Sequence, residues 1–217
     1  WRNPGRNKFH AAVEFSVEKS RSTETVRPDI VLFVNGIPFC VIECKAPQIG
    51  LEQAVSQAIR NQNDDHIPRL FVYVQAILAV NKNAAMYATA GTAAKFWAVW
   101  KEANLEDGSR EHTSLQKTVN EPLPKNTAEK LKETFSLPDE FFNSNRLVTE
   151  QDKALYSLCR PERLLELAWK FTLFDGGIKK IARYQQYFVI KSTLQRVKQF
   201  ENQNARKGGI IWQTQGS

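Results

Sequence analysis

The chain has no run of eighteen apolar residues and no basic start followed by an apolar core. The first absence excludes a membrane-spanning helix, and the second leaves no visible secretory signal. Cysteine is scarce, with Cys40, Cys44 and Cys159 the three in 217 residues, and no Cys-x-x-Cys occurs. Zinc or redox chemistry is therefore not expected, and the default is a cytoplasmic protein with reduced thiols.

Charge is unevenly distributed along the chain. Thirty Lys and Arg against 23 Asp and Glu give a formal net charge of +7 and a sequence pI near 9.3. Between residues 176 and 208, eight basic residues accompany one acidic residue, Glu201. A basic surplus favours polyanionic partners, nucleic acid first, although a solvated helix face gives the same pattern.

Hydrophobic periodicity in the first half predicts an α/β domain with a mixed central β-sheet flanked by helices. Alternation of apolar and polar residues predicts a strand over 9–15. A stretch that is apolar on both faces predicts a central strand over 30–34. The Asn35-Gly36 turn then leads into a strand over 38–45. A helix over 51–63 and a long strand over 70–80 follow.

The second half is predicted to be mainly helical. The polar segment 101–123 lacks a clear period and is expected to be a loop. A helix capped by Asn126 is predicted over 126–135. A short helix is predicted after Pro138, and another over 161–171, beginning at Pro161. A helix carrying the apolar stripe Tyr187, Ile190, Leu194 and Val197 comes next. Gly208-Gly209 ends it, and Ile210-Ile211-Trp212 is expected to begin a buried strand.

Three charged residues, Asp29, Glu43 and Lys45, form the candidate active site. Period two places Phe39, Val41, Glu43 and Lys45 on one face of their strand. Asp29 and Glu43 would supply oxygens to Mg²⁺, with the backbone carbonyl of Cys44 as a third ligand. Lys45 would position the attacking hydroxide and stabilise the developing oxyanion.

This hypothesis requires a particular strand register. A strict two-residue hairpin at Asn35-Gly36 places Asp29 opposite Ile42, on the wrong face. A three-residue loop with a bulge places Asp29 opposite Glu43, so we expect an extra residue in the turn. The alternative is a surface salt bridge between strand-end charges, but burying such charges without a function is costly.

The stretch from Arg27 to Lys45, RPDIVLFVNGIPFCVIECK, resembles the nuclease signature of the restriction (R) subunit of type I restriction-modification enzymes. The resemblance implies a PD-(D/E)xK endonuclease core ahead of a superfamily 2 translocase motor, with Asp29, Glu43 and Lys45 at the catalytic positions. That family commonly has Gln-x-x-x-Tyr on the helix after the lysine. Gln57 is at the glutamine position, with Gln53 as its rival, whereas Asn61 replaces the tyrosine and has no assigned role.

The resemblance continues towards the end of the chain. Residues 183–187, RYQQY, are similar to the motor's adenine-reading element, with Gln186 the expected contact and Gln185 the alternative. Residues 209–217 look like the first motor strand running into a phosphate-binding loop, where Gly216 and Ser217 would contact ATP. Lys179, Lys180 and Arg183 are candidates for contacts with the DNA backbone.

These similarities imply an endonuclease domain over 1–135, whose leading helix is expected to be absent. A helical linker and the start of the motor domain would occupy 136–205. The first motor strand and a truncated phosphate-binding loop would occupy 206–217.

The implied function is Mg²⁺-dependent cleavage of double-stranded DNA, driven by ATP in the intact subunit, in a complex with modification and specificity subunits. The fragment alone is expected to be weak or inactive. The alternatives are a non-catalytic DNA-binding or assembly module, favoured by Asn61, and a resolvase or repair nuclease on the same core.

Overall fold

The computed structural model describes residues 3–143, 145–202 and 205–212. Its centre is a mixed five-stranded sheet in the order β1-β4-β5-β6-β7. The strands are β1 (Phe9–Val13), β4 (Ile30–Val34), β5 (Ile37–Cys44), β6 (Ala76–Asn81) and β7 (Ala84–Ala88). β5 and β6 run parallel, and the other neighbours are antiparallel. The predicted mixed α/β fold is confirmed.

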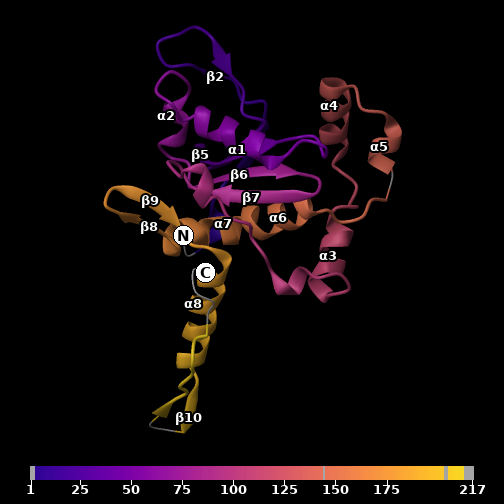
Figure 1. Ribbon diagram of the computed structural model, residues 1–217. Coiled ribbons are helices and arrows are strands. Elements are labelled where there is room, and N and C mark those ends of the chain that lie inside the picture. Colours follow the sequence, from indigo (N-terminus) through magenta and orange to yellow (C-terminus); the bar gives the residue numbers. More distant parts are fainter. Residues whose placement is uncertain (1–2, 144, 203–204, 213–217) are drawn as a thin grey trace.

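Helix α1 (Leu51–Arg60) connects the parallel pair and covers one face of the sheet (Figure 1). It buries Leu51, Ala54, Val55 and Ala58, the i, i+3, i+4, i+7 spacing of an amphipathic helix. Together with α2 (Pro68–Phe71), it packs on the face of β4, β5 and β6 that carries Val31, Val41 and Ile77. Alanine at two of the contact positions lets α1 lie close to the strands.

Helices α6 (Glu150–Cys159) and α7 (Pro161–Lys170) cover the opposite face (Figure 1). Leu158 of α6 and Leu164 of α7 share a hydrophobic core with Ile42 and Leu78 of the sheet. A capping box at Thr149 begins α6, and Pro161 in the first turn begins α7, as its fixed φ suits that position. This covering layer comes from the segment predicted to be a linker; the predicted domain boundaries stay predictions.

Shorter helices and strands lie outside the central sheet and the helices that cover it. Those before α6 are η1 (Pro4–Arg6), β2 (Val17–Glu18), β3 (Thr25–Val26), η2 (Ala94–Phe96), η3 (Ala103–Leu105), α3 (Arg110–Thr118), α4 (Lys125–Phe135) and α5 (Asp139–Asn143). After α7 come the hairpin β8 (Thr172–Asp175) and β9 (Ile178–Ile181), α8 (Tyr184–Val197), and the short pair β10 (Phe200–Asn202) and β11 (Ala205–Arg206). None of the helices in the described part of the chain is long and apolar enough to cross a membrane.

The long strand predicted over 70–80 is wrong in its first part. Pro68 begins the short helix α2, which buries Leu70 and Phe71, and the strand starts only at Ala76. Proline at a first helical position is the signal that decides this. Strand β7, which pairs with β6 through a tight turn after Asn81, was not predicted.

Three predictions in the second half are also wrong. The segment 101–123 contains η3 and α3, and the Ser109 hydroxyl caps α3 by accepting from the N–H of His112. Helix α4 begins at Lys125 after Pro124, so Asn126 lies inside its first turn and does not cap it. Ile210 and Trp212 are exposed and form no strand.

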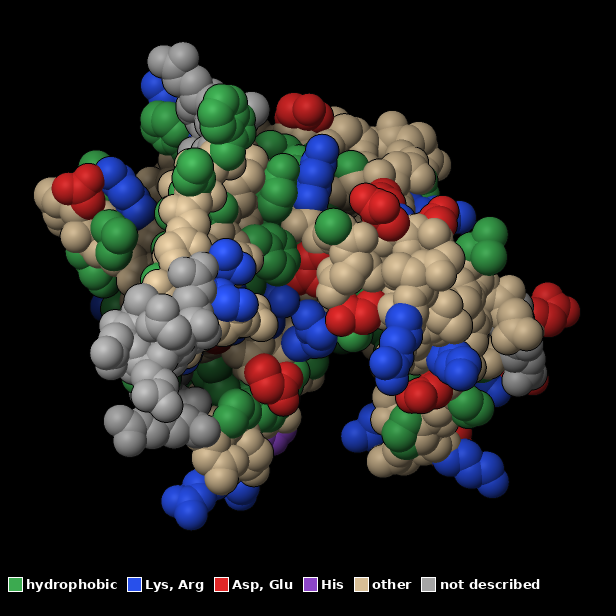
Figure 2. Space-filling model, turned by 90° about the horizontal axis from the view of Figure 1, so that it is seen from below, with side chains coloured by type: hydrophobic (Ala, Val, Ile, Leu, Met, Phe, Trp, Pro, Cys, Tyr) green, Lys and Arg blue, Asp and Glu red, His purple; other side chains and the backbone are tan. Residues whose placement is uncertain are grey.

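The apolar stripe of α8 divides into two parts. Tyr187, near the start of the helix, is buried against Phe171 and Trp100. Ile190 and Leu194 are about half exposed, where α8 projects away from the sheet (Figure 1). Figure 2, which looks at the molecule from that side, shows basic and acidic side chains interspersed over the surface.

Candidate active site

The register between β4 and β5 changes by one residue part-way along the pair. Val34 pairs with Ile37 and Phe33 with Pro38, so Asn35-Gly36 is a two-residue turn. Both turn residues have positive φ, 53° and 81°, as a type I′ turn requires. Further from the turn the pairing is shifted by one residue, so that Leu32 lies opposite Cys40 and Ile30 opposite Ile42. The same register, extended by one residue, places Asp29 opposite Glu43.

The odd register offset is therefore confirmed, but its predicted position in the turn is wrong. The extra residue is Phe39, inside β5, which makes a β-bulge. Pro38, next to it, has no N–H to contribute to a regular ladder, and proline in strands is confined to edges, strand starts and bulges. The bulge also corrects the predicted face of Phe39, which packs in the same core as Cys40 and Ile42.

Glu43 is fully buried, with 0% of its surface exposed. Its two carboxylate oxygens accept hydrogen bonds from two amides of one helix. The Gln57 side-chain N–H donates to Oε2 at 2.7 Å, and the Asn61 side-chain N–H donates to Oε1 at 3.0 Å. Gln57 and Asn61 are four residues apart, so they lie on the same face of α1 and at its end.

Lys45 is connected to Glu43 through Gln57. Its Nζ donates to Gln57 Oε1 at 2.6 Å, while its backbone N–H donates to the carbonyl of Val80 at 2.9 Å, which extends the parallel pairing of β5 with β6. Gln57 thus accepts a hydrogen bond from the lysine and donates one to the glutamate. Gln53, one turn earlier, is exposed, so the geometry favours Gln57 over its rival.

Asp29 is held by the backbone of the neighbouring strands. Its Oδ2 accepts a hydrogen bond from the N–H of Cys44 at 2.6 Å, and its carbonyl accepts one from the N–H of Glu14 at 2.9 Å. The aspartate is half-buried. The structure therefore brings Asp29, Glu43, Cys44 and Lys45 to one end of the sheet.

Burial raises the pKa of Glu43 to about 7, and the nearby Asp29 carboxylate is the second cause. Burial also raises the pKa of the Cys44 thiol to about 11, again helped by Asp29 and Glu43. Two carboxylates close together in a partly dry site repel each other when both are ionised. A divalent cation relieves that repulsion.

The donors at this site are hard oxygens. Within the described residues, no group of three or more His, Cys, Asp or Glu side chains is placed to hold a metal. Two carboxylates and the carbonyl of Cys44 match Mg²⁺, which keeps several waters and takes few protein ligands.

Gln185 and Gln186, the two residues predicted to read the adenine of ATP, lie in the first turn of α8. The Gln186 side-chain oxygen accepts from the N–H of Arg183 at the start of α8. Gln185 has a buried Oε1 without a hydrogen-bond partner in the described part of the chain. Gly216 and Ser217 lie outside the described residues.

Lys179 and Lys180, predicted to contact DNA, lie on the β8–β9 hairpin, and Arg183 immediately precedes α8. Lys179 Nζ donates to the carbonyl of Val74 at 2.8 Å, and burial lowers its pKa. Lys180 Nζ is 2.5 Å from Asp175 Oδ2. Val74 precedes β6, so the hairpin contacts the end of that strand opposite Val80 and the carboxylates.

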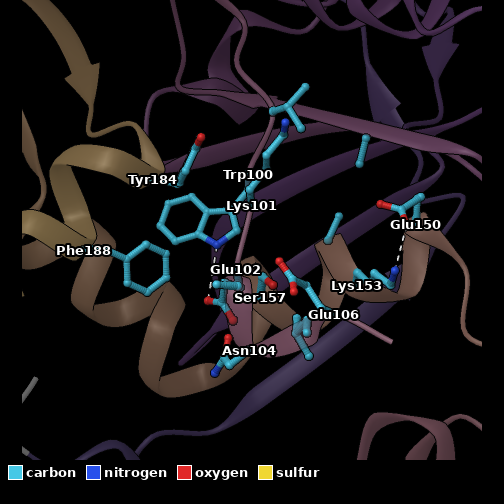
Figure 3. A pocket seen from close by; sticks show the side chains of 15 residues that line it. Trp100, Lys101, Glu102, Asn104, Glu106, Glu150, Lys153, Ser157, Tyr184 and Phe188 are labelled. Atoms are coloured by element: carbon cyan, nitrogen blue, oxygen red, sulfur yellow. Dashed lines mark hydrogen bonds and ion pairs between the residues drawn. The ribbon is translucent and has the colours of Figure 1, made fainter. Parts of the chain in front are cut away.

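A separate cavity of about 710 Å³ lies between β7, α6, α8 and the segment 99–106. Figure 3 shows the Trp100, Tyr184 and Phe188 rings on one side and the Trp100 indole N–H directed at the Glu102 carboxylate, at 3.3 Å. Glu102 also pairs with Arg163 of α7. None of Asp29, Glu43, Lys45 and Gln57 lines this cavity.

Comparison with known proteins finds a family that the first part of the chain resembles. Residues 1–96, which contain β1, β4, β5, α1 and β6, match the family described as Type I restriction enzyme R protein N terminus (HSDR_N). This part of the chain is therefore similar to the N-terminal region of type I restriction enzyme R proteins. The resemblance predicted from the sequence is thereby confirmed.

Relatives named as type I restriction enzyme endonuclease subunits align with nearly the whole chain. The Type I restriction enzyme HindI endonuclease subunit of Haemophilus influenzae is 28% identical over 98% of the chain. The Putative type I restriction enzyme MjaIXP endonuclease subunit of Methanocaldococcus jannaschii is 26% identical over 99%. The alignments cover 18% and 19% of those proteins, so the chain spans about a fifth of their length.

Asn61 is the site residue to which sequence reasoning assigned no role. It is buried, with 1% exposed, and it contacts Glu43 directly. Its signal was present in the sequence, because it is four residues after Gln57. A residue four positions along a helix lies above the first on the same face.

Proposed function

We propose that the chain is the nuclease region of a type I restriction enzyme R subunit and that it hydrolyses phosphodiester bonds of double-stranded DNA with Mg²⁺. The observation that carries this proposal is the buried Glu43 carboxylate, linked through Gln57 to Lys45 and set opposite Asp29. A buried acid with a raised pKa and amides as its direct partners is a suitable ligand for a cation. The names of the relatives support the same activity.

Asp29 and Glu43 would hold the metal, with the carbonyl of Cys44 as a third ligand. The Cys44 N–H donates to Asp29 Oδ2, which holds the Asp29 carboxylate at this end of the sheet. When bound, Mg²⁺ lowers the pKa of a coordinated water and neutralises charge on the phosphate.

Lys45 would act on the reacting groups as a cation. Its bond to Gln57 Oε1 holds the ammonium group beside Glu43 without a direct ion pair, so the charge is not cancelled by the acid. In that position the ammonium orients an attacking water and stabilises the negative charge that develops on the phosphate. Gln57 keeps the lysine and the glutamate at a fixed separation.

The remaining parts of the proposal concern the longer protein. ATP would drive a translocase motor that follows the nuclease region, with Gln186, or Gln185, at the adenine and Gly216 and Ser217 at the phosphates. DNA contacts from Lys179, Lys180 and Arg183 would be to the backbone. Modification and specificity subunits, in the cytoplasm, would supply target recognition.

The experiment uses the full-length subunit with its partner subunits, ATP and Mg²⁺, and compares wild type with Lys45→Ala. We expect DNA cleavage to be lost while translocation continues at the wild-type rate. Lys82→Ala is the matched control, since Lys82 is an exposed lysine in the β6–β7 turn. Cleavage at the wild-type rate by Lys45→Ala would show that the assignment is wrong.

A further inference from the structure

The hydrogen bonds that Asn61 makes at the end of α1 involve its backbone and not its side chain. Its backbone N–H donates to the carbonyl of Gln57 at 2.9 Å, and its carbonyl accepts from the N–H of Ile67 at 3.1 Å. Those two bonds end α1 whatever the side chain is. The residue has φ −60° and ψ −19°, an ordinary helical conformation, so the preference of asparagine for left-handed positions does not explain it.

The side chain is also unfavourable for stability by itself. Asn61 is 1% exposed, and its Oδ1 has no hydrogen-bond partner within the described residues. A buried acceptor without a partner is destabilising. Among the described residues, the hydrogen bond from its side-chain N–H to Glu43 Oε1 is what offsets this burial.

Gln57 and Asn61 together restrain the carboxylate of Glu43. With Gln57 alone, the carboxylate could rotate about its terminal bond while keeping Oε2 near the amide, because such sp³–sp² torsions have broad minima. A second amide, one helical turn further on, fixes Oε1 and so fixes the carboxylate plane. The lone pairs that remain are then held in one direction.

We infer that Asn61 is a positioning residue that orients the Glu43 carboxylate for its metal, dividing the task with Gln57, which holds the other oxygen and Lys45. The inference rests on the proposed function. Asn61 does not contact DNA or the reacting atoms in this scheme. It acts through Glu43, as partners of metal ligands do when they orient those ligands.

The test compares Asn61→Asp and Asn61→Ala in the full-length subunit with its partner subunits. Asn61→Asp keeps the size and replaces the N–H donor by an acceptor. Asn63→Ala is the matched control, because Asn63 is exposed two residues further along. The measurements are the Mg²⁺ concentration that half-saturates cleavage, the cleavage rate at saturating Mg²⁺, translocation, and Mn²⁺ binding by electron paramagnetic resonance without nucleotide.

We expect both Asn61 variants to raise the half-saturating Mg²⁺ concentration by about 10- to 100-fold, the range found when partners of metal ligands are removed. The rate at saturating Mg²⁺ should fall less, and translocation should not change. The Mn²⁺ signal that Asp29→Ala abolishes should weaken by a similar factor in Asn61→Asp, and Asn63→Ala should match wild type throughout.

Two results would overturn the inference. One is an unchanged Mg²⁺ requirement in an Asn61 variant that folds and translocates normally. The other is a lower cleavage rate with the same Mg²⁺ requirement and Mn²⁺ signal, which would mean a structural role only. If Asn61→Ala does not fold, Asn61→Asp decides, since its volume fits the site. If Lys45→Ala cleaves DNA normally, the proposed function fails, whereas an effect of Lys45→Ala without an effect at Asn61 refutes only the inference.

Discussion

Asp29 and Glu43 stand opposite each other across β4 and β5 because Phe39 adds one residue to β5. With the tight Asn35-Gly36 turn and no bulge, Asp29 would face Ile42, and the two carboxylates would lie on opposite sides of the sheet. The turn sets where the hairpin begins, and the bulge sets which side chains meet at its open end. Bulges next to active sites often re-aim a side chain in this way.

Gln57→Ala should reduce DNA cleavage by about 10- to 100-fold in the intact complex, because Lys45 and Glu43 lose their common partner. Gln53→Ala, one turn earlier on the same helix and exposed, should have no effect. The measurement is cleavage of supercoiled DNA at fixed ATP and Mg²⁺. Equal losses in the two variants would contradict the assignment of Gln57.

The pH dependence of cleavage should follow the ionisation of the Glu43 carboxyl group. Its pKa is raised to about 7 by burial and by Asp29, and the ionised form binds the metal. At limiting Mg²⁺, cleavage should therefore increase as the pH rises through about 7. Saturating Mg²⁺ should move that midpoint to lower pH, since metal binding favours the ionised form. A midpoint independent of Mg²⁺ would exclude Glu43 as the titrating ligand.

Without metal, the same group should destabilise the fold at higher pH. A carboxyl whose pKa is raised on folding favours the protonated native state, so stability is lost as the pH rises from about 4.5 through 7. The full effect above pH 7 is on the order of 3 kcal/mol. Glu43→Gln removes this ionisation. Urea unfolding of the chain at pH 5 and pH 8 should show the variant gaining relative to wild type at pH 8, and no relative gain would contradict the burial argument.

Glu102→Ala should destabilise the chain by about 3–5 kcal/mol, because it leaves the largely buried Arg163 without its ion-pair partner. The Glu102 side chain is 1% exposed and forms an ion pair with Arg163, whose side chain is 13% exposed. Glu106→Ala, an exposed acid of the same segment, should change stability by no more than about 0.5 kcal/mol. Urea unfolding midpoints test both, and equal midpoints would show that the Glu102 pair does not stabilise the fold.

Much of the sheet and site could be predicted because their signals are local. Apolar stretches indicated β4 and β5, and the spacing of Asp29, Glu43 and Lys45 indicated the site. Helix α3 was not predicted because Leu115 is its one buried residue. A single buried position gives no helical repeat of apolar residues in the sequence. The spacing from Gln57 places Asn61 on the same face of α1, but its contact with Glu43 also depends on how closely α1 packs on β5. That distance is set by tertiary packing.

Asp29 and Glu43 are proposed to hold a divalent metal jointly at the end of β4 and β5. The most direct measurement is anomalous diffraction from crystals of the full-length subunit soaked in Mn²⁺, for wild type and for Glu43→Gln. We expect a Mn²⁺ peak beside the Asp29 and Glu43 carboxylates in wild type, and its loss in the variant. A wild-type site without Mn²⁺ at saturating concentration, or a peak that Glu43→Gln leaves unchanged, would contradict it.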